Sequence, residues 1–136
     1  MLAYFVDTWF FIAFLNERDS HHLTALRLAR TLHDTSFVTH DGVLSELLAF
    51  FSGYGSAWRR EVGSLVRDVL SSRKYKVTPL DRHLFEEGLT LYEHRLDKNY
   101  SLIDCVSMQL MLRRDIKRVL TNDHHFEQEG FVLVNE

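Results

Sequence analysis

Short apolar runs alternate with longer segments in which apolar residues recur every three or four positions, and this alternation restricts the fold more than any other feature. The short runs predict strands, at residues 2–6, 36–39, 75–78, 118–121 and 131–134. The longer segments predict helices, at residues 8–16, 20–33, 41–51, 58–71, 81–95 and 101–113. Ser20 and Asp41 are the expected N-caps of the second and third of these helices. Strands that alternate with helices pair in parallel through right-handed crossovers. The pattern therefore predicts an α/β fold with a central parallel sheet.

The length of the chain fits one folded unit. It has 136 residues, of which 46% are hydrophobic and 26% are charged. This composition is typical of globular proteins and excludes a disordered or low-complexity chain. Because no linker, repeat or change in composition interrupts the sequence, we expect a single domain over residues 1–136.

Two features bear on where the protein acts. Cys105 is the only cysteine, which excludes an intramolecular disulfide and a zinc site made of cysteines. A reduced, cytoplasmic setting is therefore the default expectation. The apolar N-terminal region predicts no membrane span, because Asp7 interrupts it and the run at 9–15 is too short to cross a bilayer.

The formal net charge is −3, from 16 Lys and Arg against 19 Asp and Glu. Proteins that bind nucleic acids are usually basic, so taken alone this charge argues against such a role. If four carboxylates bind metal ions, however, 15 acids remain against 16 basic residues. The net charge therefore excludes neither function.

Two acids follow predicted strands. Asp7 comes directly after the first strand. Asp123 follows the strand at 118–121, with only Asn122 between them. In open parallel sheets, ligands bind at the carboxyl ends of the strands, near the point where the strand order reverses. Both acids are expected at that edge.

Two further acids lie on predicted helices and face toward the core. Glu46 lies at the edge of the apolar side of its helix. That side is predicted to comprise Val43, Leu44, Leu47, Leu48, Phe50 and Phe51. Asp104 is in line with Met108 and Met111, which are four and seven positions further on. If these acids meet those at the strand ends, their mutual repulsion requires a hard cation such as Mg²⁺.

Each acid also has a structural alternative. Asp7 and Asp123 follow strands, where aspartate often caps the next helix. Ser101 and Asp104 have the spacing of a capping box, and Glu46 could pair with an arginine. The two interpretations stay open for each residue taken alone.

Four segments together resemble the ordered acidic motifs of PIN domains, above all those of VapC-type toxins. The segments are FVDT at 5–8, LSEL at 44–47, DKNYSLIDC at 97–105 and TNDHHF at 121–126. The first alone is weak, whereas the last two are specific. The resemblance covers nearly the whole chain.

The resemblance implies a three-layer α/β/α sandwich around the parallel sheet and an endoribonuclease that requires Mg²⁺ or Mn²⁺. It also implies roles for individual acids: Asp7, Glu46 and Asp104 would be the central metal ligands, and Asp123 a fourth catalytic acid that often acts through water. The residues implied beside this cluster are Thr8, Asp97 and Ser101.

The resemblance further implies partners. The substrate would be single-stranded or looped RNA, because unpaired segments bend into an open cleft. VapC-type toxins are silenced by a cognate antitoxin and usually form homodimers, and the run at 9–14, apolar on every side, is consistent with such contacts. Arg95 and Lys98 are candidate RNA contacts, with a solvated helix face as the alternative.

Neighbouring residues in the same segments have simpler interpretations. His124 and His125 point about 100° apart on a helix, so they rarely share an ion, and we expect a surface or capping role. Tyr100 and Cys105 are interpreted as core residues.

Two other functions remain to be distinguished. A stand-alone PIN nuclease in RNA processing or decay would need no antitoxin. A non-catalytic module that binds cations or phosphate is disfavoured: a receiver-like site needs an acidic pair near the first strand and a lysine after a late strand, and both are missing. A phosphatase of the haloacid dehalogenase type needs a second Asp where Trp9 stands.

Overall fold

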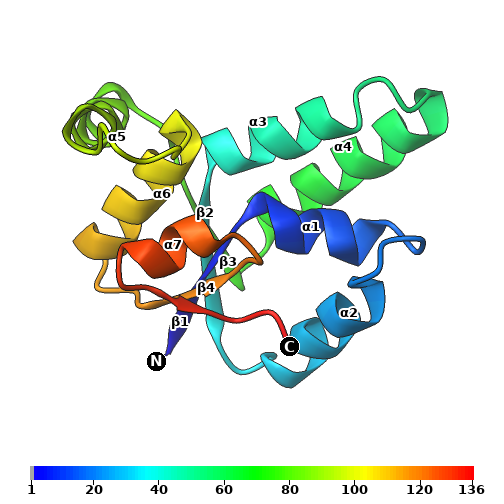
Figure 1. Ribbon diagram of the computed structural model, residues 1–136. Helices are drawn as coiled ribbons and strands as arrows, with labels where there is room; N and C mark the ends of the chain where they lie inside the picture. The colour runs from blue at the N-terminus through cyan, green and yellow to red at the C-terminus, as the bar shows by residue number, and fades with distance from the viewer. Residues whose placement is uncertain (1) are drawn as a thin grey trace.

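The computed structural model describes residues 2–136, so Met1 of the predicted domain lies outside the described residues (Figure 1). The strands form one five-stranded sheet with the order β3-β2-β1-β4-β5, and every neighbouring pair is parallel. Their bounds are β1 Ala3–Val6, β2 Ser36–His40, β3 Tyr75–Thr78, β4 Arg118–Leu120 and β5 Val132–Leu133. The predicted central parallel sheet is confirmed.

The helices cover both faces of the sheet. Figure 1 shows α1 to α4 on one side of the strands and α5 to α7 on the other. Their bounds are α1 Thr8–Leu15, α2 His22–Thr31, α3 Asp41–Phe50, α4 Ser56–Ser71, α5 Arg82–His94, α6 Leu102–Arg113 and α7 His124–Gln128. This division follows from right-handed crossovers, because the chain runs from β1 to β3 in one direction and then reverses to β4 and β5. The three-layer α/β/α sandwich is confirmed.

The strand order reverses beside β1, the central strand. β1 pairs with β2 on one side and with β4 on the other, and Val6 lies opposite Leu120. The pairing extends one residue further, since the backbone N–H of Asp7 donates to the carbonyl of Leu120 at 3.3 Å. The residues that follow β1 and β4 therefore lie side by side at the carboxyl edge of the sheet.

Two predicted helix starts are wrong. Asp41 does not cap α3; the cap is the fully buried His40, whose Nδ1 accepts a hydrogen bond from the backbone N–H of Gly42. Asp41 is the first helical residue, and its carboxylate accepts from the N–H of Leu80. Ser20 does not cap the second helix either. The chain forms turns through residues 17–21, and the helix begins only after His21.

The apolar side of α3 is narrower than predicted. Val43, Leu44, Leu47 and Phe51 are buried, but Leu48 and Phe50 are exposed. The helix packs on α1 and α4. Leu48 and Phe50 lie outside this contact: both side chains are exposed, and Phe50 lines a pocket. Among residues 2–136, no helix has the length and the apolar character needed to cross a membrane.

Candidate active site

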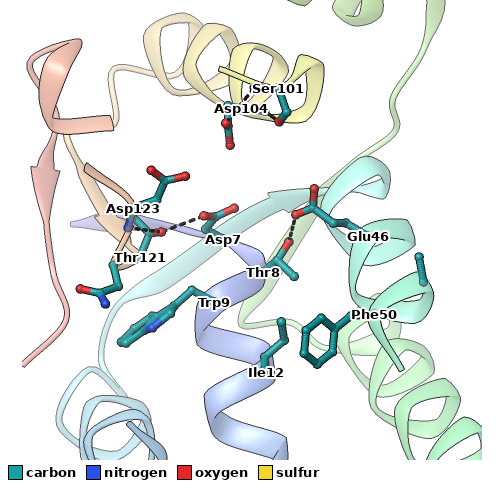
Figure 2. Close-up of a pocket in the computed structure, with 12 residues that line it drawn as sticks. Asp7, Thr8, Trp9, Ile12, Glu46, Phe50, Ser101, Asp104, Thr121 and Asp123 are labelled. Carbon is teal, nitrogen blue, oxygen red and sulfur yellow. Dashed lines mark hydrogen bonds between the residues drawn. The ribbon is translucent and has the colours of Figure 1, made fainter. Parts of the chain in front are cut away.

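A pocket of about 800 Å³ opens at the carboxyl ends of β1 and β4 (Figure 2). One side of it is acidic and is formed by the carboxylates of Asp7, Glu46, Asp104 and Asp123. The opposite side is apolar and is formed by Trp9, Ile12, Ala49 and Phe50. The structure thus brings together four acids that are far apart in the chain. Their role as ligands remains a prediction.

Asp7 is the most buried of the four acids, with 7% of its surface exposed. It stands at the N-cap position of α1 but makes no capping hydrogen bond with its side chain. Instead, its Oδ2 accepts a hydrogen bond of 2.8 Å from the hydroxyl of Thr121. The capping alternative therefore does not account for Asp7.

The burial of Asp7 raises the pKa of its carboxyl group to about 7. The hydroxyl of Thr121 and the backbone N–H of Thr8 oppose this rise by stabilising the charged form, and the nearby carboxylates of Asp104 and Glu46 add to it. A carboxylate held in this way gains most from a cation, because a positive charge offsets both the lost hydration and the repulsion.

Glu46 lies on α3 at the rim of the pocket and is exposed, so the prediction that it faces toward the core is wrong. The hydroxyl of Thr8 donates a hydrogen bond to its Oε1 (Figure 2). In the described part of the chain, Glu46 forms no ion pair with an arginine or a lysine. The alternative that Glu46 pairs with an arginine is therefore wrong.

Asp104 and Asp123 do cap helices. Asp104 and Ser101 form the capping box at the start of α6, with both hydrogen bonds at 3.0 Å. Asp123 caps α7 by accepting from the backbone N–H of His125 at 2.9 Å. The structural interpretation is therefore correct for these two residues, and the pocket contains both of them as well.

Capping a helix and binding a metal ion are compatible roles for these acids, because each capping bond uses only one oxygen of the carboxylate. The backbone and hydroxyl donors reach Oδ2 of Asp104, Oδ1 of Asp123 and Oε1 of Glu46. Among residues 2–136, no hydrogen bond reaches the second oxygen of these three carboxylates. One oxygen is held by the fold, and the other is available to a ligand.

Two polar residues of the site were missed by the sequence analysis. Thr121 is fully buried and anchors Asp7. His125 lies against the acids, with Nδ1 at 3.3 Å from both Asp104 Oδ2 and Asp123 Oδ1. The sequence did contain a signal for His125. Adjacent residues on a helix point about 100° apart, so His125 can face the acids while His124 faces outward and contacts Glu127.

Not all the predicted residues meet at the pocket. Thr8 and Ser101 line it, as expected of side chains beside the cluster. Asp97 lies elsewhere: its side chain is 80% exposed and is 3.8 Å from the Nζ of Lys98. The guanidinium of Arg95 is held by Glu129 through two hydrogen bonds of 3.0 Å, so its predicted RNA contact would compete with an ion pair.

The donor set fits a hard divalent cation. Carboxylate oxygens are the preferred ligands of Mg²⁺ and Mn²⁺, and the pocket lining described here holds four carboxylates with neither Lys nor Arg. One atom from each of Asp104, Asp123 and His125 also lies within 4.8 Å of the others, close enough to surround one ion.

Comparisons with known proteins agree on one fold family. A sequence model of the PIN domain matches residues 4–131. The structure resembles that of VapC20 from Mycobacterium tuberculosis, described as a toxin that cleaves the sarcin–ricin loop, with a TM-score of 0.86, 26% identity, and coverage of 97% of this chain and 98% of that one. It also resembles VapBC2 from Rickettsia felis, solved with a DNA fragment from its promoter (TM-score 0.68, 15% identity, 99% of both chains). A search of curated protein sequences found no match.

Proposed function

Because the chain belongs to the PIN domain family, as the match over residues 4–131 shows, we propose that it is an endoribonuclease that requires Mg²⁺ or Mn²⁺ and is the toxin of a toxin–antitoxin pair. The observation that carries the proposal is the pocket at the edge of β1 and β4. Four carboxylates converge there, with neither Lys nor Arg in the described lining.

The acids have distinct tasks in this proposal. Asp7, Glu46 and Asp104 hold the cation, and Asp123 completes the set as the fourth acid. When bound, a divalent cation lowers the pKa of a water molecule, holds the scissile phosphate and neutralises charge on the leaving oxygen. Thr8 and Thr121 keep Glu46 and Asp7 oriented by donating to one oxygen of each carboxylate.

The protein itself supplies no covalent nucleophile in this mechanism. Cys105 is buried, and its burial raises the pKa of the thiol to about 11, which keeps it protonated at neutral pH. The hydroxyl of Ser101 is engaged in the capping box of α6. We therefore propose that water attacks the phosphodiester.

The proposed substrate is single-stranded or looped RNA. The pocket is open, and its apolar side carries the partly exposed rings of Trp9 and Phe50 within reach of the acids (Figure 2). Aromatic rings of this kind stack on unpaired bases. The toxin from Mycobacterium tuberculosis described as cleaving the sarcin–ricin loop, 26% identical to this chain, supports a looped target.

The proposal includes a cognate antitoxin, a homodimer, a cytoplasmic location and a single nuclease domain over residues 1–136. The exposed ring of Phe50, which lines the pocket, and that of Tyr54, whose centroid is 5.7 Å from it, support a protein partner. A gene for a small DNA-binding protein directly upstream would favour the toxin; its absence would favour a stand-alone nuclease in RNA processing or decay.

Cleavage of RNA by the purified chain tests the proposal. Single-stranded RNA is incubated with Mn²⁺ or Mg²⁺, with and without chelator, beside the variants Asp7→Asn, Glu46→Gln and Asp104→Asn. We expect cleavage by the unmodified protein, no cleavage with chelator, and loss of cleavage in each variant. Asp104→Asn keeps an oxygen that accepts from Ser101, so α6 should remain capped and the circular dichroism spectrum unchanged.

The matched control is Asp68→Asn, which neutralises an exposed acid on α4 away from the pocket. It should cleave like the unmodified protein. Cation binding without any cleavage would favour the non-catalytic module, and cleavage that persists in Asp104→Asn would remove this residue from the mechanism.

A further inference from the structure

The imidazole of His125 connects two of the four acids. Its Nδ1 lies 3.3 Å from Oδ2 of Asp104, at the start of α6, and 3.3 Å from Oδ1 of Asp123, just before α7. These acids are 19 positions apart in the sequence and belong to different elements. His125 is the side chain that contacts both.

The chemistry of the neighbours fixes the role of Nδ1. Ionised carboxylate oxygens accept hydrogen bonds and donate none, so the nitrogen that faces two of them must carry a proton. Nδ1–H therefore donates to Oδ2 of Asp104, and Oδ1 of Asp123 lies at the same distance without forming a hydrogen bond with the ring. The oxygens it reaches are the same ones that accept the capping bonds of Ser101 and of the His125 backbone.

The ring of His125 is held in place by the buried Tyr100 and, through it, by two half-buried side chains. The ring of Tyr100 packs against it, with 5.2 Å between the two centroids. The hydroxyl of Tyr100 donates to Glu129 at 2.8 Å, and Glu129 is bound through both of its oxygens by Arg95. The imidazole is thus oriented by α7 and by the segment before α6, and this limits its motion.

We propose that His125 is a positioning residue, which donates from Nδ1 to Asp104, lies against Asp123, and so turns the second oxygen of each toward one cation. Figure 2 shows the carboxylates of Asp7, Asp104 and Asp123 around a common space. This inference rests on the proposed function, because it assigns His125 to the same cation site. Hydrogen bonds to the ligands of a metal typically change its affinity 10–100-fold.

Cation affinity of paired histidine variants tests this role. Mn²⁺ is titrated calorimetrically into the full chain at one pH, for the unmodified protein, His125→Gln and His125→Asn. The amide N–H of Asn occupies the place of Nδ1, whereas that of Gln lies further out, near the place of Nε2. We expect His125→Gln to weaken Mn²⁺ binding about 10–100-fold and His125→Asn to restore most of the affinity.

The control is His124→Gln, a change of the same chemistry at the exposed neighbouring histidine. It should leave the affinity for Mn²⁺ unaltered. Circular dichroism verifies that all variants fold, and electron spin echo spectroscopy on bound Mn²⁺ reports whether a nitrogen coordinates the ion.

Two results would overturn the inference. One is equal affinity in His125→Gln and the unmodified protein. The other is a directly bound nitrogen whose signal disappears in His125→Asn, since the imidazole would then be a ligand and not a hydrogen-bond donor. If the unmodified protein binds no Mn²⁺ and cleaves no RNA, the proposed function itself fails, and this outcome is distinct from both.

Discussion

Asp7 keeps a carboxyl group in a place with little access to water. Only 7% of the residue is exposed, and Thr121 provides the one side-chain hydrogen bond to it in the described chain. Because burial raises its pKa from 3.8 to about 7, this carboxyl group keeps a proton in the folded protein between pH 4 and 7, where the unfolded chain releases it. The unfolding free energy must therefore depend on pH.

The sign of this dependence is set by which state binds more protons. Between pH 4 and 7 the folded state binds more at Asp7, so the unfolding free energy falls as pH rises through this window and stays lowered above it. His40 acts in the opposite sense, because burial lowers its pKa from 6.5 to about 4 and stability is lost as pH falls from 6.5 toward 4.

We predict that Asp7→Asn removes the contribution of Asp7 and leaves that of His40. In chelator, the difference in unfolding free energy between the unmodified protein and the variant should fall between pH 4 and 7, by up to about 4 kcal/mol for a shift of about three pKa units. Urea unfolding at a series of pH values measures this. A difference that does not vary with pH would mean that the carboxyl group of Asp7 ionises normally.

At the scale of the elements, α5 and α6 approach each other closely at Gly88. A Cβ at this position would lie 2.4 Å from Cγ2 of Val106 and 3.1 Å from the backbone N and Cα of Val106. The backbone of α6 cannot yield as the end of a flexible side chain can. The contact matters for the site, because α6 carries Asp104 at its N-terminus.

Gly88→Ala should destabilise the protein by about 1–3 kcal/mol through overpacking between the helices. The matched control is Gly63→Ala on α4, where an added Cβ meets nothing within 4 Å. The control should be stabilised by about 0.4–1 kcal/mol, since alanine loses less entropy than glycine in a helix. Urea unfolding compares the two variants, and equal effects would contradict the close approach.

The elements themselves could be predicted from the sequence to within a few residues at most ends, but some of their contacts could not. Apolar periodicity identifies α3 as a helix, yet it does not reveal that Leu48 and Phe50 lie beyond the helices packed against it. The cap at His40 was missed because the buried imidazole also needs Ser107, which lies 2.9 Å from its Nε2 and 67 positions further on.

At the scale of the molecule, the predicted parallel pairing indicated that Asp7 and Asp123 lie at the same edge of the sheet, because parallel strands end at one edge, and the strand order observed in the structure places them side by side. Helical spacing added Glu46 and Asp104. The hydrogen bonds that orient these acids were beyond prediction, since those from Thr121 to Asp7 and from Thr8 to Glu46 depend on side-chain directions in the folded state.

If a cation binds among these acids, it should stabilise the whole fold, since the unfolded chain has no such site. Saturating Mn²⁺ at 100 times its dissociation constant would add about 2.7 kcal/mol to the unfolding free energy. This corresponds to a rise in melting temperature of roughly 5–10 °C for a chain of this size. Differential scanning calorimetry with Mn²⁺, and with NaCl at the same ionic strength, measures the rise.

Asp7→Asn should reduce this rise strongly, because it removes the most buried of the ligands. A rise of the same size in the variant would show that Mn²⁺ stabilises the protein from another place.

The hydrogen bond from Thr121 to Asp7 spans 114 positions of the chain. During translation, Asp7 leaves the ribosome long before Thr121 and Asp123 are made, so the central strand has to wait for its partner β4. A nascent or prematurely terminated chain that stops before Thr121 therefore has no complete set of acids. If the proposed cleavage of RNA requires all four acids, the growing chain cannot begin it before residues 121–123 have been made.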